Sequence, residues 1–169
     1  MSLESAPTPH ADPADAPAAR VAAILVANHL MTLATVRADG WPQATIVNYL
    51  ADGLALHFLI SRKSQKMANI LHDPRVSIAI GQDDADGVRG LSMAAHVQEV
   101  DPEAHIEALD RRIRLASGKE AFEPHPTGRD VAVLRATPIL VSLIDWDRSP
   151  GQARLFSVAD NWGLIPVDG

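Results

Sequence analysis

Hydrophobic and polar residues alternate with a period of two over much of this chain, and turn-like stretches separate the alternating segments. This pattern predicts β-strands over residues 31–36, 43–50, 54–60, 76–80, 88–100, 131–136, 139–146 and 152–158. Asp-Gly pairs at 39–40 and 52–53 end the first two segments, and that dipeptide is typical of tight hairpins. We therefore expect the first three strands to form an antiparallel meander.

Apolar residues at helical spacing predict three short helices, over residues 16–29, over residues 64–72 and from residue 101 onward. Asp15 and Pro17 are suited to the N-cap and the first turn of the first helix, and Asp101 and Pro102 repeat that arrangement. Pro74 prevents the second helix from continuing. The acidic stretch 83–87 and the proline-containing stretch 118–128 are expected to be loops.

Many short strands with few helices favour an antiparallel barrel or sandwich over βαβ units. The expected fold class is mainly β with a few short helices, an α+β arrangement. We expect a flexible arm at 1–15, one domain at 16–158, and a tail without a clear pattern at 159–169.

Composition and charge narrow the possible functions. The 169 residues carry a formal charge of −6, which argues against nucleic-acid or anionic-membrane partners. No apolar run is long enough to span a bilayer, and the first residues do not resemble a secretory signal. The absence of cysteine excludes disulfides and thiolate chemistry. A cytoplasmic protein is the resulting expectation.

One stretch carries candidate chemistry for binding an anion. Ser61-Arg62-Lys63-Ser64-Gln65-Lys66 lies where the third strand ends and the second helix begins. Hydroxyls and cations at a helix N-terminus suit a phosphate, because free N–H groups and the helix dipole favour negative charge there. The alternative is a serine N-cap followed by a solvated basic turn.

Other common sites are absent from the sequence. There is no G-x-S-x-G nucleophile motif and no complete phosphate-binding loop. The seven histidines show no pair at i, i+4, so no metal site is expected. No residue is singled out as a catalytic acid, base or nucleophile.

Several segments, taken in order, resemble the pyridoxamine 5′-phosphate oxidase-like family of FMN-binding split β-barrels. The resemblance covers about Ala18 to Val100 and, more weakly, Pro138 to Val158. The segments that carry it are Met31–Val36, Asp39-Gly40 with Pro42, Phe58–Ser61, Ser64-Gln65-Lys66, Asn69, Asp73–Ser77 and Leu143–Trp146.

The resemblance implies FMN as cofactor and a set of residues that would hold it. Ser64 and Lys66 match the family's Ser-Arg-Lys phosphate clamp, with Gln65 in place of the arginine, and Arg62 or Lys63 could partly compensate. The other residues implied are Thr45, Ile46, Val47 and Asn48 along the flavin, Ile60 and Ser61 beside the clamp, Gly90 in the Arg89-Gly90 pair, and Trp146.

The resemblance also implies a homodimer with the flavin at the subunit interface. The leading interpretation is an FMN-dependent oxidoreductase acting on an unknown small molecule. True pyridoxamine phosphate oxidases continue Arg-Leu with His-Asp-Arg, whereas this chain continues Arg154-Leu155 with Phe156-Ser157, so oxidation of vitamin B6 phosphates is not expected. The alternative is a non-catalytic split barrel that binds haem, with His57, His72 and His96 as candidate ligands, a deazaflavin or another planar ligand.

Overall fold

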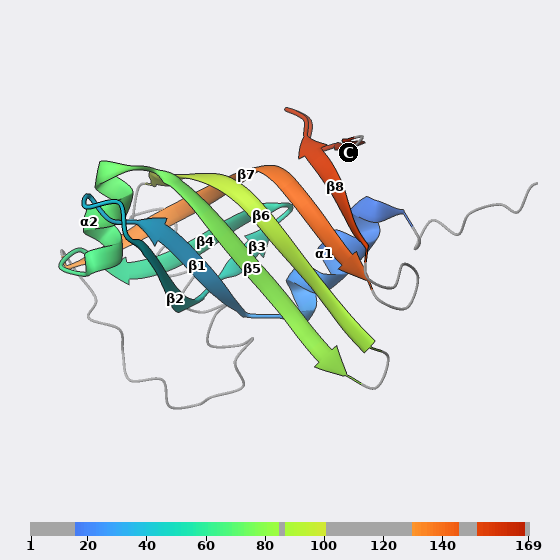
Figure 1. Cartoon of the computed structure of the whole chain (residues 1–169), viewed down its shortest axis with the longest axis horizontal. Helices are drawn as coiled ribbons and strands as arrows, with labels where there is room; N and C mark the ends of the chain where they lie inside the picture. Colours follow the sequence, from blue (N-terminus) through green and yellow to red (C-terminus); the bar gives the residue numbers. More distant parts are fainter. Residues whose placement is uncertain (1–15, 85–86, 101–129, 146–151, 168–169) are drawn as a thin grey trace, which may run out of the picture.

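The computed structural model describes residues 16–84, 87–100, 130–145 and 152–167 (Figure 1). The expected N-terminal arm, the helix from residue 101, the 118–128 loop and Trp146 lie outside these ranges. The elements within them are α1 (Pro17–Ala27), β1 (Leu30–Val36), β2 (Pro42–Asn48), β3 (Leu50–Asp52), β4 (Ala55–Ser61), α2 (Gln65–His72), β5 (Arg75–Asp84), β6 (Gly87–Glu99), β7 (Val131–Asp145), β8 (Ala153–Val158) and β9 (Leu164–Pro166).

The strands form one antiparallel sheet in the order β2-β1-β5-β6-β7-β4-β3, and β8 and β9 continue from β7. The two ends of this path, β2 and β3, are joined in the chain by Tyr49 alone. Because one residue cannot cross a wide open sheet, the sheet curls until its ends meet, as a split barrel does. The predicted class, mainly β with a few short helices, is confirmed.

The predicted meander is wrong in its second half. The first Asp-Gly turn joins β1 to β2 in full register, from Leu30 opposite Asn48 to Val36 opposite Pro42. The second joins only three residues, 50–52, to β4, and β4 takes β7 as its other neighbour. A local pattern fixes each hairpin, but it does not reveal that the chain changes its position in the sheet at Tyr49.

Strands expected to be separate or short are longer in the structure. β7 runs unbroken through Pro138, and the register with β6 shifts between Ala94 and Ala95, opposite that proline. A bulge accommodates a residue that has no N–H to give to the ladder. The 83–87 segment is not an open loop, because Asp84 pairs with Gly87. The tail also contains a strand, β9, paired with β8.

The core lies inside the barrel and is made of alternate residues of β1, β5 and β6, together with consecutive buried residues of β4 and β7. Phe58, Leu33, Ile78, Met93 and Leu143 are among the fully buried side chains. α1 is shorter than expected at both ends and has Ala16 rather than Asp15 at its N-cap, and α2 begins one residue later than expected. No helix in the described ranges is long and apolar enough to cross a membrane.

Tyr49 also fastens α1 to the barrel. Its hydroxyl donates a hydrogen bond to the Leu25 carbonyl (3.0 Å), and its backbone N–H donates to the His29 carbonyl (3.0 Å). Burial raises the pKa of the Tyr49 phenol above its usual range, so the hydroxyl keeps the proton that it donates.

The outward face of the sheet carries no charge over two complete rows of cross-strand neighbours, which we call the uncharged face. The strand registers define the rows, and alternation places these residues opposite the buried ones. One row is Ile46, Thr32, Ala79, Ser92, Ser142 and Leu155; the other is Ala44, Ala34, Ser77, Ala94, Leu140, Ser157 and Ile165. In a chain with 21% charged residues, this is an unusual exposed surface.

Candidate anion and flavin site

The turn from β4 into α2 is held by its own serines. The Ser64 hydroxyl donates to the Ser61 carbonyl (2.7 Å) and accepts from the Met67 N–H (3.3 Å), which makes Ser64 the N-cap of α2. The Ser61 hydroxyl oxygen accepts from the Lys63 N–H (3.2 Å). The Ser64 proton is therefore already donated, whereas the Ser61 hydroxyl proton remains available to a ligand.

Three cations surround this turn, and two of them face carboxylates. Arg62 forms a bidentate ion pair with Glu99, which raises the pKa of its guanidinium, and Lys63 Nζ lies 3.5 Å from an Asp130 oxygen. Lys66 is half-buried on the first turn of α2 and has no carboxylate partner among the described residues. The two substitutes considered for the missing clamp arginine thus already face carboxylates, and among the described residues of this turn Lys66 is the cation that does not.

These groups fit a phosphate. The first N–H groups of a helix have no acceptor inside it, so those of Gln65 and Lys66 are free to donate to an anion together with Lys66 Nζ. The Ser61 hydroxyl adds a further donor at the end of β4. The structure brings five of the predicted site residues together here: Ile60, Ser61, Ser64, Gln65 and Lys66.

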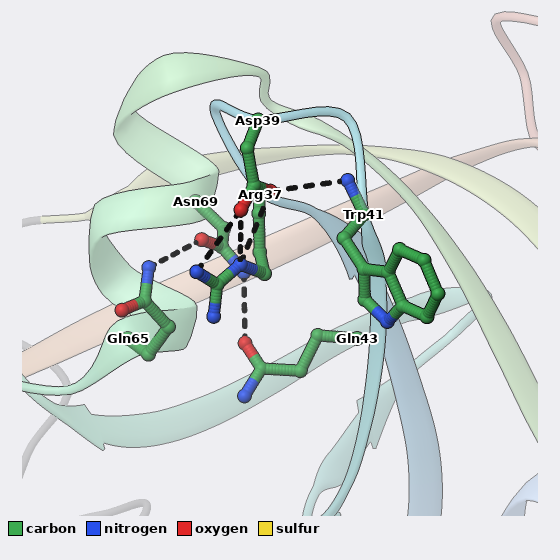
Figure 2. A network of polar contacts seen from close by, with 6 residues as sticks. All are labelled: Arg37, Asp39, Trp41, Gln43, Gln65 and Asn69. Carbon is green, nitrogen blue, oxygen red and sulfur yellow. Dashed lines mark hydrogen bonds and ion pairs between the residues drawn. The ribbon is translucent and has the colours of Figure 1, made fainter.

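A buried hydrogen-bond network joins α2 to the β1–β2 hairpin (Figure 2). Asn69, only 1% exposed, donates to the Thr35 hydroxyl (2.9 Å) and to the Gln43 Oε1 (2.9 Å), and it accepts from the Gln65 Nε2 (2.9 Å). Thr35 is itself 3% exposed. Asn69 was not among the predicted site residues, and its place in the middle of a short helix gave no sign of this role.

The hairpin turn beside this network is fixed by a separate pair. Arg37 donates to both Asp39 carboxylate oxygens (3.1–3.3 Å), and Asp39 accepts from the Trp41 N–H (3.1 Å), as Figure 2 shows. The hydrogen bonds from Arg37 hold the pKa of the Asp39 carboxyl below its usual range.

The predicted flavin segment Thr45–Asn48 lies on β2, whose only partner among the described strands is β1. The other edge of β2 therefore presents backbone N–H and C=O groups that a ligand can reach. The segment starts two residues beyond Gln43, which the network ties to α2. The clamp residues and the β2 edge thus follow one another along one side of the barrel.

Gly90 is not close to the predicted flavin segment Thr45–Asn48 of the same chain. It lies on β6, and β1 and β5 separate it from β2, a distance of about 14 Å at three strand spacings. Gly90 faces Gly81 across β5 and β6 beneath a shallow depression of about 450 Å³ on the uncharged face. A Cβ on Gly90 would lie 3.0 Å from the Ile80 carbonyl oxygen, so close packing of the sheet itself requires glycine there.

The histidines named as possible haem ligands do not converge. His57 is buried on β4, whereas His72 ends α2 and His96 is exposed on β6. No group of three potential metal-ligating side chains occurs in the part of the chain that the structure describes.

The described residues thus form an antiparallel split-barrel fold in which a helix start with free N–H groups and a lysine lies beside an open strand edge. The comparison with known families identifies the class further. Residues 18–144 match the pyridoxamine 5′-phosphate oxidase family, and the chain belongs to it.

Three solved structures illustrate the range of its relatives. An F420 reductase is 27% identical over 71% of this chain and 94% of that protein, with a TM-score of 0.61. A Listeria innocua protein provisionally assigned as a pyridoxamine 5′-phosphate oxidase is 21% identical, over 74% and 95%, with a TM-score of 0.59. A haem-binding protein from Mycobacterium smegmatis is 21% identical, over 82% and 56%, with a TM-score of 0.66. The last two similarities show the shared fold.

Proposed function

We propose that this chain is a flavin-dependent oxidoreductase that holds FMN with its phosphate at the start of α2 and its ring system along the free edge of β2. The observation that carries the proposal is Lys66, which has no carboxylate partner among the described residues and lies on the first turn of a helix whose first N–H groups have no acceptor within the helix. The edge of β2 begins beside that turn, so phosphate and ring would contact adjoining elements.

The residues divide the work of binding. Lys66, the Gln65 and Lys66 N–H groups and the Ser61 hydroxyl would hold the phosphate, while the backbone of Thr45–Asn48 would contact the flavin. Bound flavin supplies the redox chemistry, and the protein supplies orientation and electrostatics. Backbone recognition depends little on side chains, so an exposed Ile46 and a half-buried Asn48 are both compatible with this segment.

We further propose a homodimer that pairs the uncharged faces of two copies. Seven strands at about 4.8 Å and the two rows of the uncharged face span roughly 34 by 14 Å, about half of the ~800 Å² per partner of a standard interface, so the proposed interface extends beyond these two rows. The pairing would bring Gly90 and the depression beside it to a flavin held by the other copy. That accounts for a predicted site whose parts are separated within one chain.

Neither the phosphate clamp nor the uncharged face indicates which substrate the protein takes. Arg154 is half-buried on β8, where its guanidinium lies 5.9 Å from the Phe156 ring centre. With no His-Asp-Arg continuation after Leu155, we expect little or no oxidation of pyridoxamine or pyridoxine 5′-phosphate. Peroxide release with either compound would measure this.

A deazaflavin is the second candidate cofactor. It is favoured by the F420 reductase, the most nearly identical of the three relatives above, and by a clamp with one free cation instead of the family's Arg-Lys pair.

The absorption spectrum of the purified protein tests the proposal. Flavin bands, or their appearance when FMN is titrated into colourless protein, are expected. A Soret band would indicate haem, and a protein that binds the deazaflavin but ignores FMN would favour the second candidate. Protein that takes up neither flavin would overturn the proposed function.

A further inference from the structure

The hydrogen bonds of the network in Figure 2 run in a definite order from donor to acceptor. That order decides which side chains present an N–H donor to a ligand. Each amide in it can point its oxygen or its nitrogen inward. Two arrangements satisfy the central Asn69. In one, Asn69 donates to Thr35 and Gln43 and accepts from Gln65; in the other, every one of these bonds is reversed.

The Thr35 hydroxyl selects the first arrangement. Its single proton has an acceptor besides Asn69 in the Gln43 backbone carbonyl, at a long 3.5 Å, and donation there leaves the Thr35 oxygen to accept from Asn69 Nδ2 (2.9 Å). Asn69 Oδ1 then faces α2 and accepts from Gln65 Nε2 (2.9 Å). The second proton of Asn69 Nδ2 goes to Gln43 Oε1 (2.9 Å).

The outer ends of the two glutamines are therefore opposite in character. Gln43 uses its oxygen inward and points its Nε2 donor away from Asn69, whereas Gln65 uses its nitrogen inward and points an acceptor oxygen outward (Figure 2). An acceptor oxygen repels a phosphate, so the outward end of the Gln65 side chain does not offer the donors that the arginine of the clamp would. Gln43 lies at the junction between the start of α2 and the Thr45–Asn48 edge, with a donor facing outward.

We propose that Gln43 is a phosphate-binding residue of this chain, and that Asn69 and Thr35 are the positioning residues that orient its amide. The proposal rests on the proposed flavin site and assigns it a residue from β2. Gln43 is half-buried, so its amide is fixed on the inner side and reachable on the outer side. Donors on two elements, α2 and β2, would then enclose the phosphate.

The isosteric substitution Gln43→Glu tests the proposed phosphate contact, because it replaces only the outward Nε2 of Gln43 with an oxygen. Glutamate keeps the inward oxygen that accepts from Asn69, and it replaces the outward donor with a charged acceptor. We expect a thermal midpoint close to that of the wild type, FMN affinity at least ~10-fold weaker, as expected when a hydrogen bond to a charged group is lost, and unchanged riboflavin affinity. Gln152→Glu, on the exposed residue before β8, controls for the added charge.

Gln65→Glu is the matched control, with the opposite expected effect on the hydrogen bond to Asn69. It removes the inward donor and sets a carboxylate against Asn69 Oδ1, so it should lower the thermal midpoint. A second readout is made on the wild-type protein. The NMR signals of the Gln43 side-chain NH₂, assigned by their loss in Gln43→Glu, should shift when FMN is added and not when riboflavin is added.

The outcomes separate the claims. If Gln43→Glu binds FMN like the wild type, or loses both flavins equally, Gln43 does not bind the phosphate. If Gln43→Glu unfolds while Gln65→Glu is stable, the network runs in the reverse direction. Wild-type protein that fails to bind FMN at all would overturn the proposed function and this assignment with it.

Discussion

Two surfaces of this barrel are built on opposite principles. The side at α2 and the β1–β2 hairpin is rich in directed polar contacts, with Asn69, Thr35 and Gln43 joined by bonds of about 2.9 Å. The uncharged face, over β2-β1-β5-β6-β7-β8-β9, has rows of alanine, serine and aliphatic residues and no charge. The first arrangement fixes atoms to fractions of an ångström, as recognition of a phosphate requires. The uncharged face defines only the shape and polarity of the surface, which is sufficient for burying that surface against a partner.

A charge placed in the centre of the uncharged face should have the largest effect on the protein. In the proposed twofold dimer, Ala79→Glu would bury like charges against the same surface of the partner, and such juxtapositions cost several kcal/mol. We expect the dimer dissociation constant to rise at least ~100-fold. Light scattering at micromolar concentration measures it, and Ala22→Glu on the exposed side of α1 is the control. A wild-type protein that is already monomeric would contradict the role given to this face.

Removal of the free cation should have the next largest effect, confined to the polar side. Lys66→Ala removes a charged hydrogen bond to the phosphate, worth about 1.5–3 kcal/mol, so FMN should bind roughly 10- to 150-fold more weakly. Riboflavin, which has no phosphate, should be unaffected in the same titration.

Arg62→Ala and Lys63→Ala are the matched controls, because their charges face Glu99 and Asp130. Both should change FMN affinity less than Lys66→Ala. Gln65→Arg should strengthen FMN binding, since arginine restores a cation and still offers Asn69 a donor. Equal losses for all three cations would show that only the overall charge of the turn matters.

The smallest expected effect concerns stability alone. Thr35→Val removes the acceptor of a buried Asn69 proton, which costs about 1–3 kcal/mol when the group is left unsatisfied. Thr35→Ser keeps the hydroxyl and should lose much less. Urea denaturation monitored by circular dichroism compares them. Similar losses for both variants would show that the hydroxyl of Thr35 contributes no more than its methyl group.

The sequence predicts what depends on neighbours in the chain, and it misses what depends on distant partners. The clamp residues 60–66 are one continuous turn, so spacing and the family resemblance located them together. The Asn69–Gln43 bond spans 26 positions, and nothing local indicates it. The same limit explains the meander, because the place of β3 and β4 in the sheet depends on β7.

The single strand β7 shows a second limit. Pro138 is typical of a strand end because proline cannot donate to a ladder, but β7 continues through a bulge at Ile139, which has no partner between Ala94 and Ala95 of β6 and which only the pairing of the two strands reveals. The three-residue strand β9 was missed because it is too short to show alternation. Nothing in the described residues tests the role expected for Trp146.

The connection through Tyr49 has a consequence for the time course of folding. β4 leaves that residue and pairs with a strand 80 positions later, Leu56 opposite Ala136. At a synthesis rate of about 5–20 residues per second, β4 emerges roughly 4–16 s before that partner does. Until then its buried residues 55–58 have only the three residues of β3 as a strand partner. Closure of the barrel is therefore a late step of folding, because it joins strands far apart in the sequence. Until that step, β4 is the part of the nascent chain most exposed to aggregation.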